Sequence, residues 1–364
     1  MKKYKICVYA ICKNEEKFVD EWVKSMSEAD KIVVLDTGST DSTVSKFRNL
    51  GIEVHQEIIS PWRFDTARNR SLELVDEDTE ICVCTDLDER FEKGWREKLE
   101  SVWNKETKRA QYRYTWNFNE DGTEGVVFWI DKIHSRKGWK WEHPVHEVLK
   151  YTGSEPCISV YAEGIQLNHF ADPEKSRAQY LPLLELSVKE APDNDRNMHY
   201  LGREYMFKGE WDKCIETLTR HLSMPSATWA DERCASMRYI AKSYLQKGNR
   251  EEAKRWYFKS IAEAPYLREP YTDFASLLYD ERDWHGIIFL AESALKITER
   301  PRTYICEAQA WGSLPYDLAS LGYYYTGNYE KSLEMVKKAL ELSPTDERLK
   351  ENKRLIENAL KKQL

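Results

Sequence analysis

Short apolar runs alternate with amphipathic segments from the N-terminus to residue 85, and this alternation restricts the possible folds more than any other feature of the chain. Apolar runs of about four to eight residues are typical of buried strands, and the segments between them have helical spacing. This order predicts a mostly parallel sheet that binds ligands beyond the carboxyl ends of its strands. The expected strands are residues 4–11, 31–35, 52–56 and 80–85, and the expected helices are residues 15–26, a segment opening near residue 41, and residues 66–74.

Aromatic residues and strand-like alternation dominate between residues 109 and 169. Residues 111–116 read QYRYTW, and residues 126–130 read VVFWI. We expect these segments to form the far side of the same sheet, together with a loop region on the substrate side.

The second half of the chain is self-similar. A turn glycine recurs at Gly209, Gly248 and Gly327, and the first two are 39 residues apart. That spacing is close to the ~34 residues of a tetratricopeptide unit with a short insertion. Small residues at matching positions around each glycine would let paired helices approach closely, and a weaker unit precedes the last one. The sequence therefore predicts an α/β domain over residues 1–171 and an all-α helical repeat domain over residues 172–364.

Composition and charge argue against several classes of protein. The formal net charge of −7 argues against a nucleic-acid partner. We expect no membrane span, because no stretch approaches the ~20 apolar residues that one needs. The 8 cysteines lack paired spacing, which favours reduced thiols and a cytoplasmic protein. The N-terminal apolar run is too short for a signal sequence.

Two carboxylates, Asp86 and Asp88, follow the fourth expected strand directly. Acids two residues apart repel each other unless a cation neutralises them. A hard divalent ion with oxygen ligands does this and also bridges a diphosphate. The alternative is a solvated acidic turn, which the short pattern alone does not exclude.

Two further clusters have a functional and a structural interpretation. Asp36 ends the second strand, where it could accept hydrogen bonds from a base or ribose, and Asp41 follows in a hydroxyl-rich helix start. Capping explains Asp41 at least in part but does not explain Asp36. Arg68 lies near the opening of a helix, a position that suits an anionic diphosphate, although a surface helix also carries such charges.

A fourth cluster contains His146 and Glu147, with His169 further along the chain. His146 offers a nitrogen ligand or a general base. The zinc-protease pattern is absent, because Lys150 stands four residues after His146. A lone histidine also has a structural explanation.

These clusters in this order resemble the family 2 glycosyltransferases, and more narrowly the bacterial and phage members in which tetratricopeptide repeats follow, including peptide S-glycosyltransferases of glycosylated bacteriocins. The resemblance covers nearly the whole chain. It rests on residues 13–16, 36–43, 67–69, 86–89, 145–147 and 168–169. It implies a GT-A fold for the first domain, a nucleotide-sugar donor, and hexosyl transfer assisted by Mn²⁺ or Mg²⁺.

The resemblance also implies roles for individual residues. Nucleotide-sugar contacts fall on Asp36, Asp41 and Arg68, and metal–diphosphate contacts on Asp86 and Asp88, of which Asp88 is the firmer. His146 and Glu147 would lie in the catalytic cleft, where His146 is also a candidate metal ligand. One departure is that many relatives have an arginine- and phenylalanine-rich segment before the His-Glu pair, whereas residues 131–136 here read DKIHSR. Donor or acceptor contacts in that segment are therefore not carried over.

The expected reaction is direct, inverting displacement at the anomeric carbon, with a UDP-sugar as donor and a peptide, protein or glycan as acceptor. The acceptor's proton would pass to Glu147 or, as second choice, to Glu89. The repeat domain would hold the acceptor or form a homodimer. Three alternatives remain: the same chemistry on a phage nucleic-acid base, a non-catalytic repeat scaffold with a degenerate domain, and a nucleotidyltransferase. The last would need a glycine-rich phosphate loop that residues 13–16 do not provide.

Overall fold

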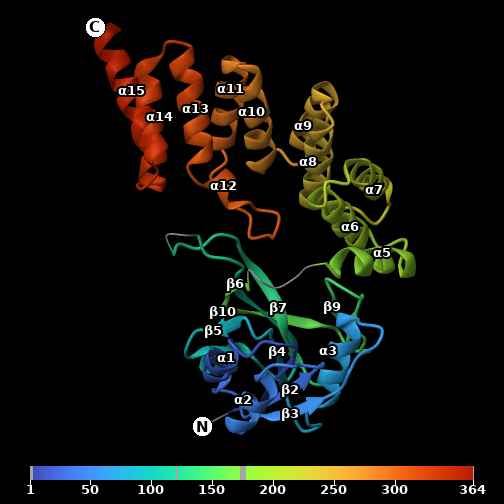
Figure 1. Cartoon of the computed structure of the whole chain (residues 1–364). Helices are drawn as coiled ribbons and strands as arrows, with labels where there is room; N and C mark the ends of the chain where they lie inside the picture. The colour runs from blue at the N-terminus through green and yellow to red at the C-terminus, as the bar shows by residue number, and fades with distance from the viewer. Residues whose placement is uncertain (1–2, 120–121, 173–177, 364) are drawn as a thin grey trace. The chain divides into compact units, whose positions relative to one another are not determined.

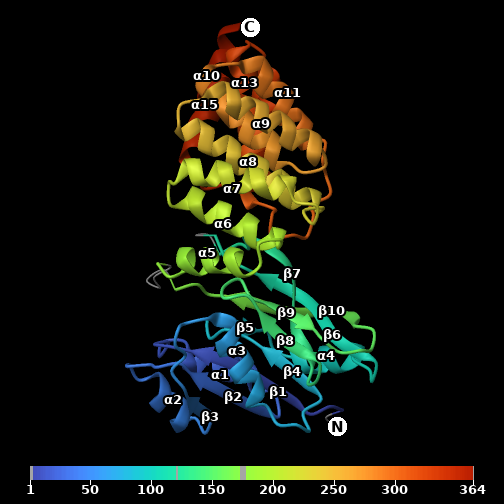
Figure 2. The same ribbon diagram turned by 90° about the vertical axis from the view of Figure 1, so that its right-hand side faces the viewer.

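Every side chain of β1 (Ile6–Cys12) is buried, and this strand lies inside the sheet with a parallel neighbour on each side, β2 (Lys31–Asp36) and β4 (Ile81–Cys84). Parallel strands covered on both faces are apolar throughout, which explains the continuous run in the sequence. The structure, a computed structural model, describes residues 3–119, 122–172 and 178–363. Within them the main sheet has the order β3-β2-β1-β4-β7-β6-β10-β5, and β8 and β9 form a separate pair (Figures 1 and 2). The remaining strands are β3 (Glu53–Gln56), β5 (Glu89–Phe91), β6 (Thr107–Thr115), β7 (Val127–Ser135), β8 (Trp139–Glu142), β9 (Val148–Tyr151) and β10 (Ile158–His169).

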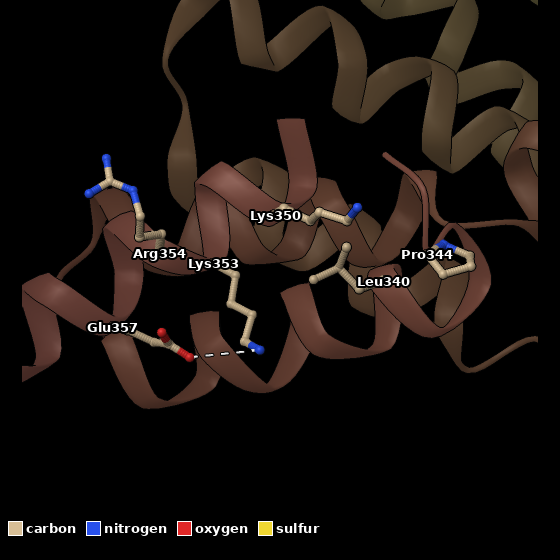
Figure 3. A pocket seen from close by; sticks show the side chains of 6 residues that line it. All are labelled: Leu340, Pro344, Lys350, Lys353, Arg354 and Glu357. Carbon is tan, nitrogen blue, oxygen red and sulfur yellow. Dashed lines mark ion pairs between the residues drawn. The ribbon is translucent and has the colours of Figure 1, made fainter. Parts of the chain in front are cut away.

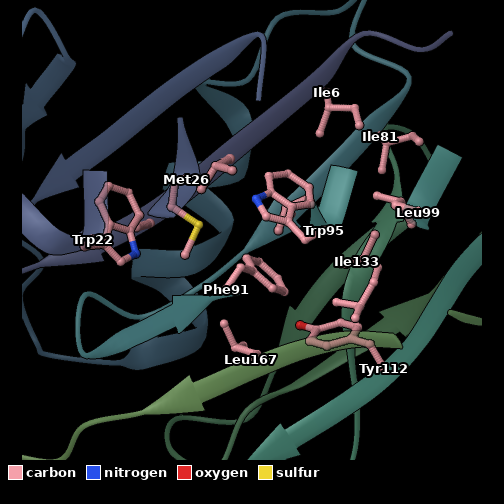
Figure 4. Packing of buried hydrophobic residues seen from close by; sticks show 14 of the residues in the cluster. Ile6, Trp22, Met26, Ile81, Phe91, Trp95, Leu99, Tyr112, Ile133 and Leu167 are labelled. Atoms are coloured by element: carbon pink, nitrogen blue, oxygen red, sulfur yellow. The ribbon is translucent and has the colours of Figure 1, made fainter. Parts of the chain in front are cut away.

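Alternate residues of β1 face two different layers. Ile6, Val8 and Ala10 pack with three helices, α1 (Val19–Met26), α2 (Thr43–Asn49) and α4 (Trp95–Val102), in the core drawn in Figure 4. Cys7 and Tyr9 face the other layer, where α3 (Phe64–Glu73) and the β8–β9 pair cover the sheet. The period-2 alternation of a strand thus divides one apolar run between two cores. It also places α3 and β8 on the same face.

The aromatic segments form the far side of the sheet, as expected. β7 pairs antiparallel with both β4 and β6, β6 runs parallel to β10, and β5 closes the edge antiparallel to β10. The predicted mostly parallel α/β fold is therefore confirmed. The pairing of β5 with β10 matters for function, because it places His169 opposite Glu89.

Consecutive helix pairs build the second half of the chain. In the described residues the paired helices are α6–α7, α8–α9, α10–α11 and α13–α14, and they bury small residues where they meet, such as Ala241 with Ala253. The predicted all-helical repeat domain is confirmed. The helices are α5 (Tyr180–Glu190), α6 (Asp195–Phe207), α7 (Trp211–Ser223), α8 (Ala230–Gln246), α9 (Arg250–Glu263), α10 (Glu269–Glu281), α11 (Trp284–Leu295), α12 (Ala308–Trp311), α13 (Leu314–Tyr325), α14 (Tyr329–Leu342) and α15 (Glu347–Gln363).

The turn inside each helix pair needs one left-handed residue. Gly209, Gly248 and Gly327 have φ of 75°, 77° and 80°. In the weaker unit Arg282 takes this place with φ of 59°, and the following amide bonds back to the preceding helix as in the other turns. The sequence marker fails in that unit because an arginine occupies the glycine position, while the geometry of the turn is unchanged.

Internal contacts divide the chain into two compact units, Met1–Ser187 and Val188–Leu364. The expected boundary at residues 171/172 stays a prediction. A pocket of about 410 Å³ opens between α14 and α15 in the second unit, with a charged rim that includes the ion pair of Lys353 and Glu357 (Figure 3). The polar clusters identified from the sequence all belong to the first unit. Among the described helices we find none that combines the length and apolar character needed to cross a bilayer.

Candidate functional site

The loops that follow β1 and β2 are tied to each other. Asn14 adopts a left-handed conformation with φ of 55°, and its amide donates to Ser39 Oγ at 2.8 Å. In return, the Thr40 amide donates to Asn14 Oδ1 at 2.7 Å. This reciprocal bonding fixes the carboxyl ends of two neighbouring parallel strands, which is where such a sheet binds ligands.

Asp36 and Asp41 both lie in this pair of loops and both accept backbone hydrogen bonds. Asp36 is buried at the end of β2, and its carboxylate accepts from the amides of Gly38 and Ser39 at 3.2 Å. Asp41 accepts from the Thr43 amide at 2.9 Å. The N-cap of α2 is Ser42, so Asp41 is not the capping residue that was expected, and it binds the first turn from one residue earlier. Asp36 has a local bonding role as well. A nucleoside contact at either residue stays a prediction.

Arg68 on α3 joins two of the predicted acidic clusters. Its buried guanidinium donates from Nη2 to Asp86 Oδ1 at 2.8 Å and from Nε to Glu147 Oε1. It also lies 5.1 Å from the ring centroid of Trp141 on β8. Burial opposes the charge of Arg68, but the carboxylates of Asp86 and Glu147 outweigh burial and raise the pKa of Arg68 well above its usual value.

Asp86 has a second cation on its other oxygen. Lys132 Nζ lies 3.1 Å from Asp86 Oδ2 and 3.3 Å from Glu89 Oε1. Burial works against ionisation of Asp86, but the charges of Arg68 and Lys132 dominate and lower the pKa of Asp86. Asp86 is therefore neutralised by two protein cations, which leaves it less available as a metal ligand than Asp88.

Asp88 is buried, and its carboxylate faces a histidine. His169 Nε2 lies 3.4 Å from Asp88 Oδ2, while His169 Nδ1 lies 2.7 Å from the carbonyl oxygen of Trp116. The ring of Trp116 stacks on His169 with centroids 4.6 Å apart. Burial would lower the pKa of His169, but the hydrogen bond and charge of Asp88 raise it. Asp88 and His169 thus form one acid–imidazole pair at the end of the β5–β10 ladder.

Glu89, the second candidate base, lies inside the protein. It is 1% exposed, and its oxygens accept from the amide of Asp86 at 2.8 Å and from the hydroxyl of Tyr114 at 2.9 Å. Burial is the main cause that raises the pKa of Glu89. These contacts give Glu89 a clear role in positioning Asp86.

His146 and Glu147 lie in the loop between β8 and β9. Glu147 reaches Arg68, whereas the half-buried ring of His146 lies edge-on to Tyr180 with centroids 5.8 Å apart. The loop is attached to the start of α3, because the Phe64 amide donates to the Pro144 carbonyl at 2.9 Å. Arg68 therefore brings two of the predicted site residues, Asp86 and Glu147, together. The ligand role of His146 stays a prediction.

Comparison with known proteins identifies the first unit. Residues 7–151 match the model of glycosyl transferase family 2. These residues form a family 2 glycosyl transferase domain. Residues 316–346 match a tetratricopeptide repeat. The predicted recognition of a family 2 domain followed by tetratricopeptide repeats is thereby confirmed, while its narrower likeness to peptide S-glycosyltransferases stays a prediction.

A curated relative supports the same assignment of the glycosyl transferase domain. The chain is 31% identical over 100 residues to the lipopolysaccharide core biosynthesis glycosyltransferase LpsC of Rhizobium meliloti (strain 1021). That match covers 27% of this chain, and it spans 36% of the length of the relative.

Solved structures of helical repeat proteins are similar to about half of the chain. One is the C-terminal part of a tetratricopeptide-repeat protein from Cytophaga hutchinsonii, with a TM-score of 0.41, 18% identity, and coverage of 51% of this chain and 67% of that one. Another is the Cut9–Hcn1 hetero-tetramer of APC/C, with a TM-score of 0.40, 14% identity, and coverage of 50% and 33%.

Of the three predicted metal ligands, Asp86, Asp88 and His146, the arrangement in the glycosyl transferase domain suits Asp88 best. Within the described residues, Asp86, Asp88 and His146 do not bring three ligand atoms within 4.8 Å of one another. Asp88 offers a buried carboxylate, and Mg²⁺-type ions are commonly held by one or two carboxylates plus substrate phosphates. A metal ion at Asp88 stays a prediction.

The sequence of the glycosyl transferase domain does not indicate the site residue Lys132 or the partner of His169. Lys132 lies in the segment from which no contacts were carried over, yet it binds Asp86. Lys132 stands between Asp131 and Ile133 in a strand that also carries His134, so no local pattern singles it out. His169 was considered, but its pairing with Asp88 depends on the β5–β10 ladder, which no local pattern indicates.

Proposed function

We propose that this chain transfers a sugar from a nucleoside diphosphate sugar, a UDP-sugar in the first instance, to a glycan or peptide acceptor with inversion at the anomeric carbon. The observation that carries the proposal is the cluster of Arg68, Asp86 and Asp88 at the end of β4, inside the family 2 domain. The cluster combines a fixed cation with a buried carboxylate, which are the two groups that a diphosphate and its metal ion require.

Arg68 and Lys132 are the groups that would receive the diphosphate. Asp86 holds both cations in place, so their charges are already positioned when the leaving group gains negative charge. A Mn²⁺ or Mg²⁺ ion at Asp88 would supply further positive charge to the departing diphosphate. Asp36, at the end of β2, remains our candidate for the ribose or base.

Glu147 is the stronger candidate for the base that takes the acceptor's proton. Its side chain is 11% exposed, compared with 2% for Glu89. In the structure Glu147 is bound to Arg68. A diphosphate that engages Arg68 competes with Glu147 and frees its carboxylate, so arrival of the donor would make the base available.

The acceptor class rests on two supports. LpsC is named for biosynthesis of a lipopolysaccharide core, which favours a glycan acceptor here. The repeat domain favours a peptide or protein, because stacked helix pairs present an extended surface for partners; the same surface could instead pair two copies of the chain.

The unpaired thiols of the described cysteines suit a cytoplasmic location.

The decisive experiment compares Asp88→Asn with Asp78→Asn, which removes an exposed acid of the same unit. Release of nucleoside diphosphate is measured with a panel of donors and with glycan, peptide and DNA acceptors, with Mn²⁺, with Mg²⁺ and with chelator. We expect Asp88→Asn to reduce turnover by roughly 100-fold or more with the fold preserved, and Asp78→Asn to leave it unchanged. Turnover that survives Asp88→Asn would overturn the proposal, and transfer to DNA would reassign the acceptor.

A further inference from the structure

Three ligand-type side chains meet inside the helical repeat unit, outside the glycosyl transferase domain. They are His199 on α6, His221 on α7 and Glu232 on α8. All three are buried, and their ligand atoms lie within 4.8 Å of one another. Each comes from a different helix, so the cluster joins the first helix pair to the helix that follows it.

Each imidazole ring has a buried nitrogen, Nε2, that makes no hydrogen bond among the described residues. Nε2 of His221 has an ion-pair contact with Glu232, so the orphaned atom is Nε2 of His199. Both rings are 0% exposed. A buried polar atom without a partner costs about 1–3 kcal/mol, and an orphan of this kind calls for a ligand. Such an atom beside a second imidazole and a carboxylate is therefore evidence for a bound species.

Ser236 orients both rings through their other nitrogens. Its Oγ lies 2.7 Å from His199 Nδ1 and 3.0 Å from His221 Nδ1. A hydroxyl oxygen has two lone pairs, so it can accept from both Nδ1–H groups at once. Both Nε2 atoms then carry lone pairs. A hydrogen-bonded Nδ1–H is the usual support of a metal-bound histidine, because it fixes the tautomer and the ring orientation.

Glu232 supplies the third atom. Its Oε1 lies 3.4 Å from His221 Nε2, and its Oε2 accepts a hydrogen bond from the hydroxyl of Tyr304. Two ligands on one tetrahedral zinc ion, with bonds of about 2.0–2.1 Å, are separated by about 3.3 Å. The Glu232–His221 distance already matches that separation. Because Tyr304 binds Oε2 of Glu232, Oε1 remains available as a metal ligand.

We propose that His199, His221 and Glu232 bind one Zn²⁺ ion, which joins α6 and α7 to α8. Two imidazoles and one carboxylate favour a borderline transition metal over Mg²⁺ or Ca²⁺, which prefer all-oxygen sites. Three protein ligands leave a fourth position for water. The site lies in Val188–Leu364, so it is separate from the oxygen-rich cation site at Asp88.

The test uses the full chain, stripped with chelator and then titrated with Zn²⁺ by calorimetry, with metal content measured after dialysis. We expect one tightly bound Zn²⁺ per chain in the wild type and in Asp88→Asn. His221→Gln and Glu232→Gln should lose it, and His285→Gln, which removes an exposed histidine of the same unit, should keep it. A rise in Tm with Zn²⁺ but not with Mg²⁺ should follow the same pattern. Zn²⁺ binding that survives both His221→Gln and Glu232→Gln would overturn the proposal.

A second measurement uses only the wild-type protein, so it does not depend on whether the variants fold. X-ray absorption of the zinc-loaded wild type should show two imidazole ligands and oxygen, without sulfur. A sulfur shell would assign the ion to a cysteine such as the exposed Cys157, and it would overturn the proposal as firmly as an absence of binding.

Discussion

Arg68 donates to Asp86 at 2.8 Å from inside the protein, with the guanidinium 4% exposed and the carboxylate 35% exposed. The same guanidinium also binds Glu147, so a single planar group spans the end of β4 and the loop after β8. The relationship explains why these distant acids belong to one site. Both the charge and the forked shape of Arg68 are therefore needed to bind the two carboxylates at once.

Arg68→Lys keeps the positive charge but removes the fork that reaches two carboxylates. We expect kcat/KM for the donor to fall by roughly 100-fold and the free energy of unfolding by about 2 kcal/mol, less than the loss of a whole buried ion-pair partner because one charge contact survives. Nucleoside diphosphate release and urea unfolding measure the two effects. Arg70→Lys, two residues along the same helix, is the matched control. Its side chain is 46% exposed, and its unfolding free energy should change by less than about 0.5 kcal/mol.

Glu147→Gln separates catalysis from donor binding. If Glu147 takes the acceptor's proton, kcat should fall by about 10²–10⁴-fold, while nucleoside diphosphate binding by calorimetry should hold or tighten because Arg68 loses a competing carboxylate. Glu89→Gln is the comparison, since Glu89 supports Asp86 and Lys132 from the interior. It should lower Tm. An unchanged kcat in Glu147→Gln, with weaker donor binding, would show that Glu147 only positions Arg68.

His134 makes the stability of the first unit depend on pH. This side chain is 0% exposed and shares a 2.9 Å hydrogen bond with the hydroxyl of Tyr9. Burial lowers the pKa of His134 to about 3. The unfolded chain titrates near 6.5, so between these values the unfolded state binds the extra proton and stability falls as pH falls.

From pH 7 to pH 5 the contribution of His134 should cost about 2 kcal/mol, at 1.36 kcal/mol for each pH unit below 6.5. Urea unfolding of the wild type and of His134→Gln across this range measures the effect. The variant should start less stable, because it loses the contact with Tyr9, but its stability should fall less steeply with pH. Equal slopes in the two proteins would contradict the assignment.

Features that depend on local order were predictable from the sequence. The strands and the acids that end them follow from apolar periodicity, because the carboxyl ends of parallel strands meet at one edge. Arg68 was expected near the opening of a helix, and this was wrong, because α3 begins at Phe64 and Arg68 lies in its middle. The partners of those acids were not predictable. Lys132 reaches Asp86 only through the antiparallel pairing of β7 with β4, and His169 reaches Asp88 only through that of β10 with β5. Strand order is set by long-range packing, and the sequence between these residues carries no mark of it.

The repeat turns allow a prediction in which two substitutions have opposite signs. Arg282 adopts φ of 59° at the position where Gly248 adopts φ of 77°. A side chain in this region costs about 1 kcal/mol, and Arg282 is exposed, so Arg282→Gly should raise the free energy of unfolding by up to about 1 kcal/mol. A Cβ at Gly248 would meet no atom within 4 Å, so Gly248→Ala tests the backbone alone and should lower stability by about 1 kcal/mol. Thermal unfolding of both variants tests this prediction. If the left-handed backbone is the cause, Tm should rise in Arg282→Gly and fall in Gly248→Ala, and a change in the same direction in both variants would contradict it.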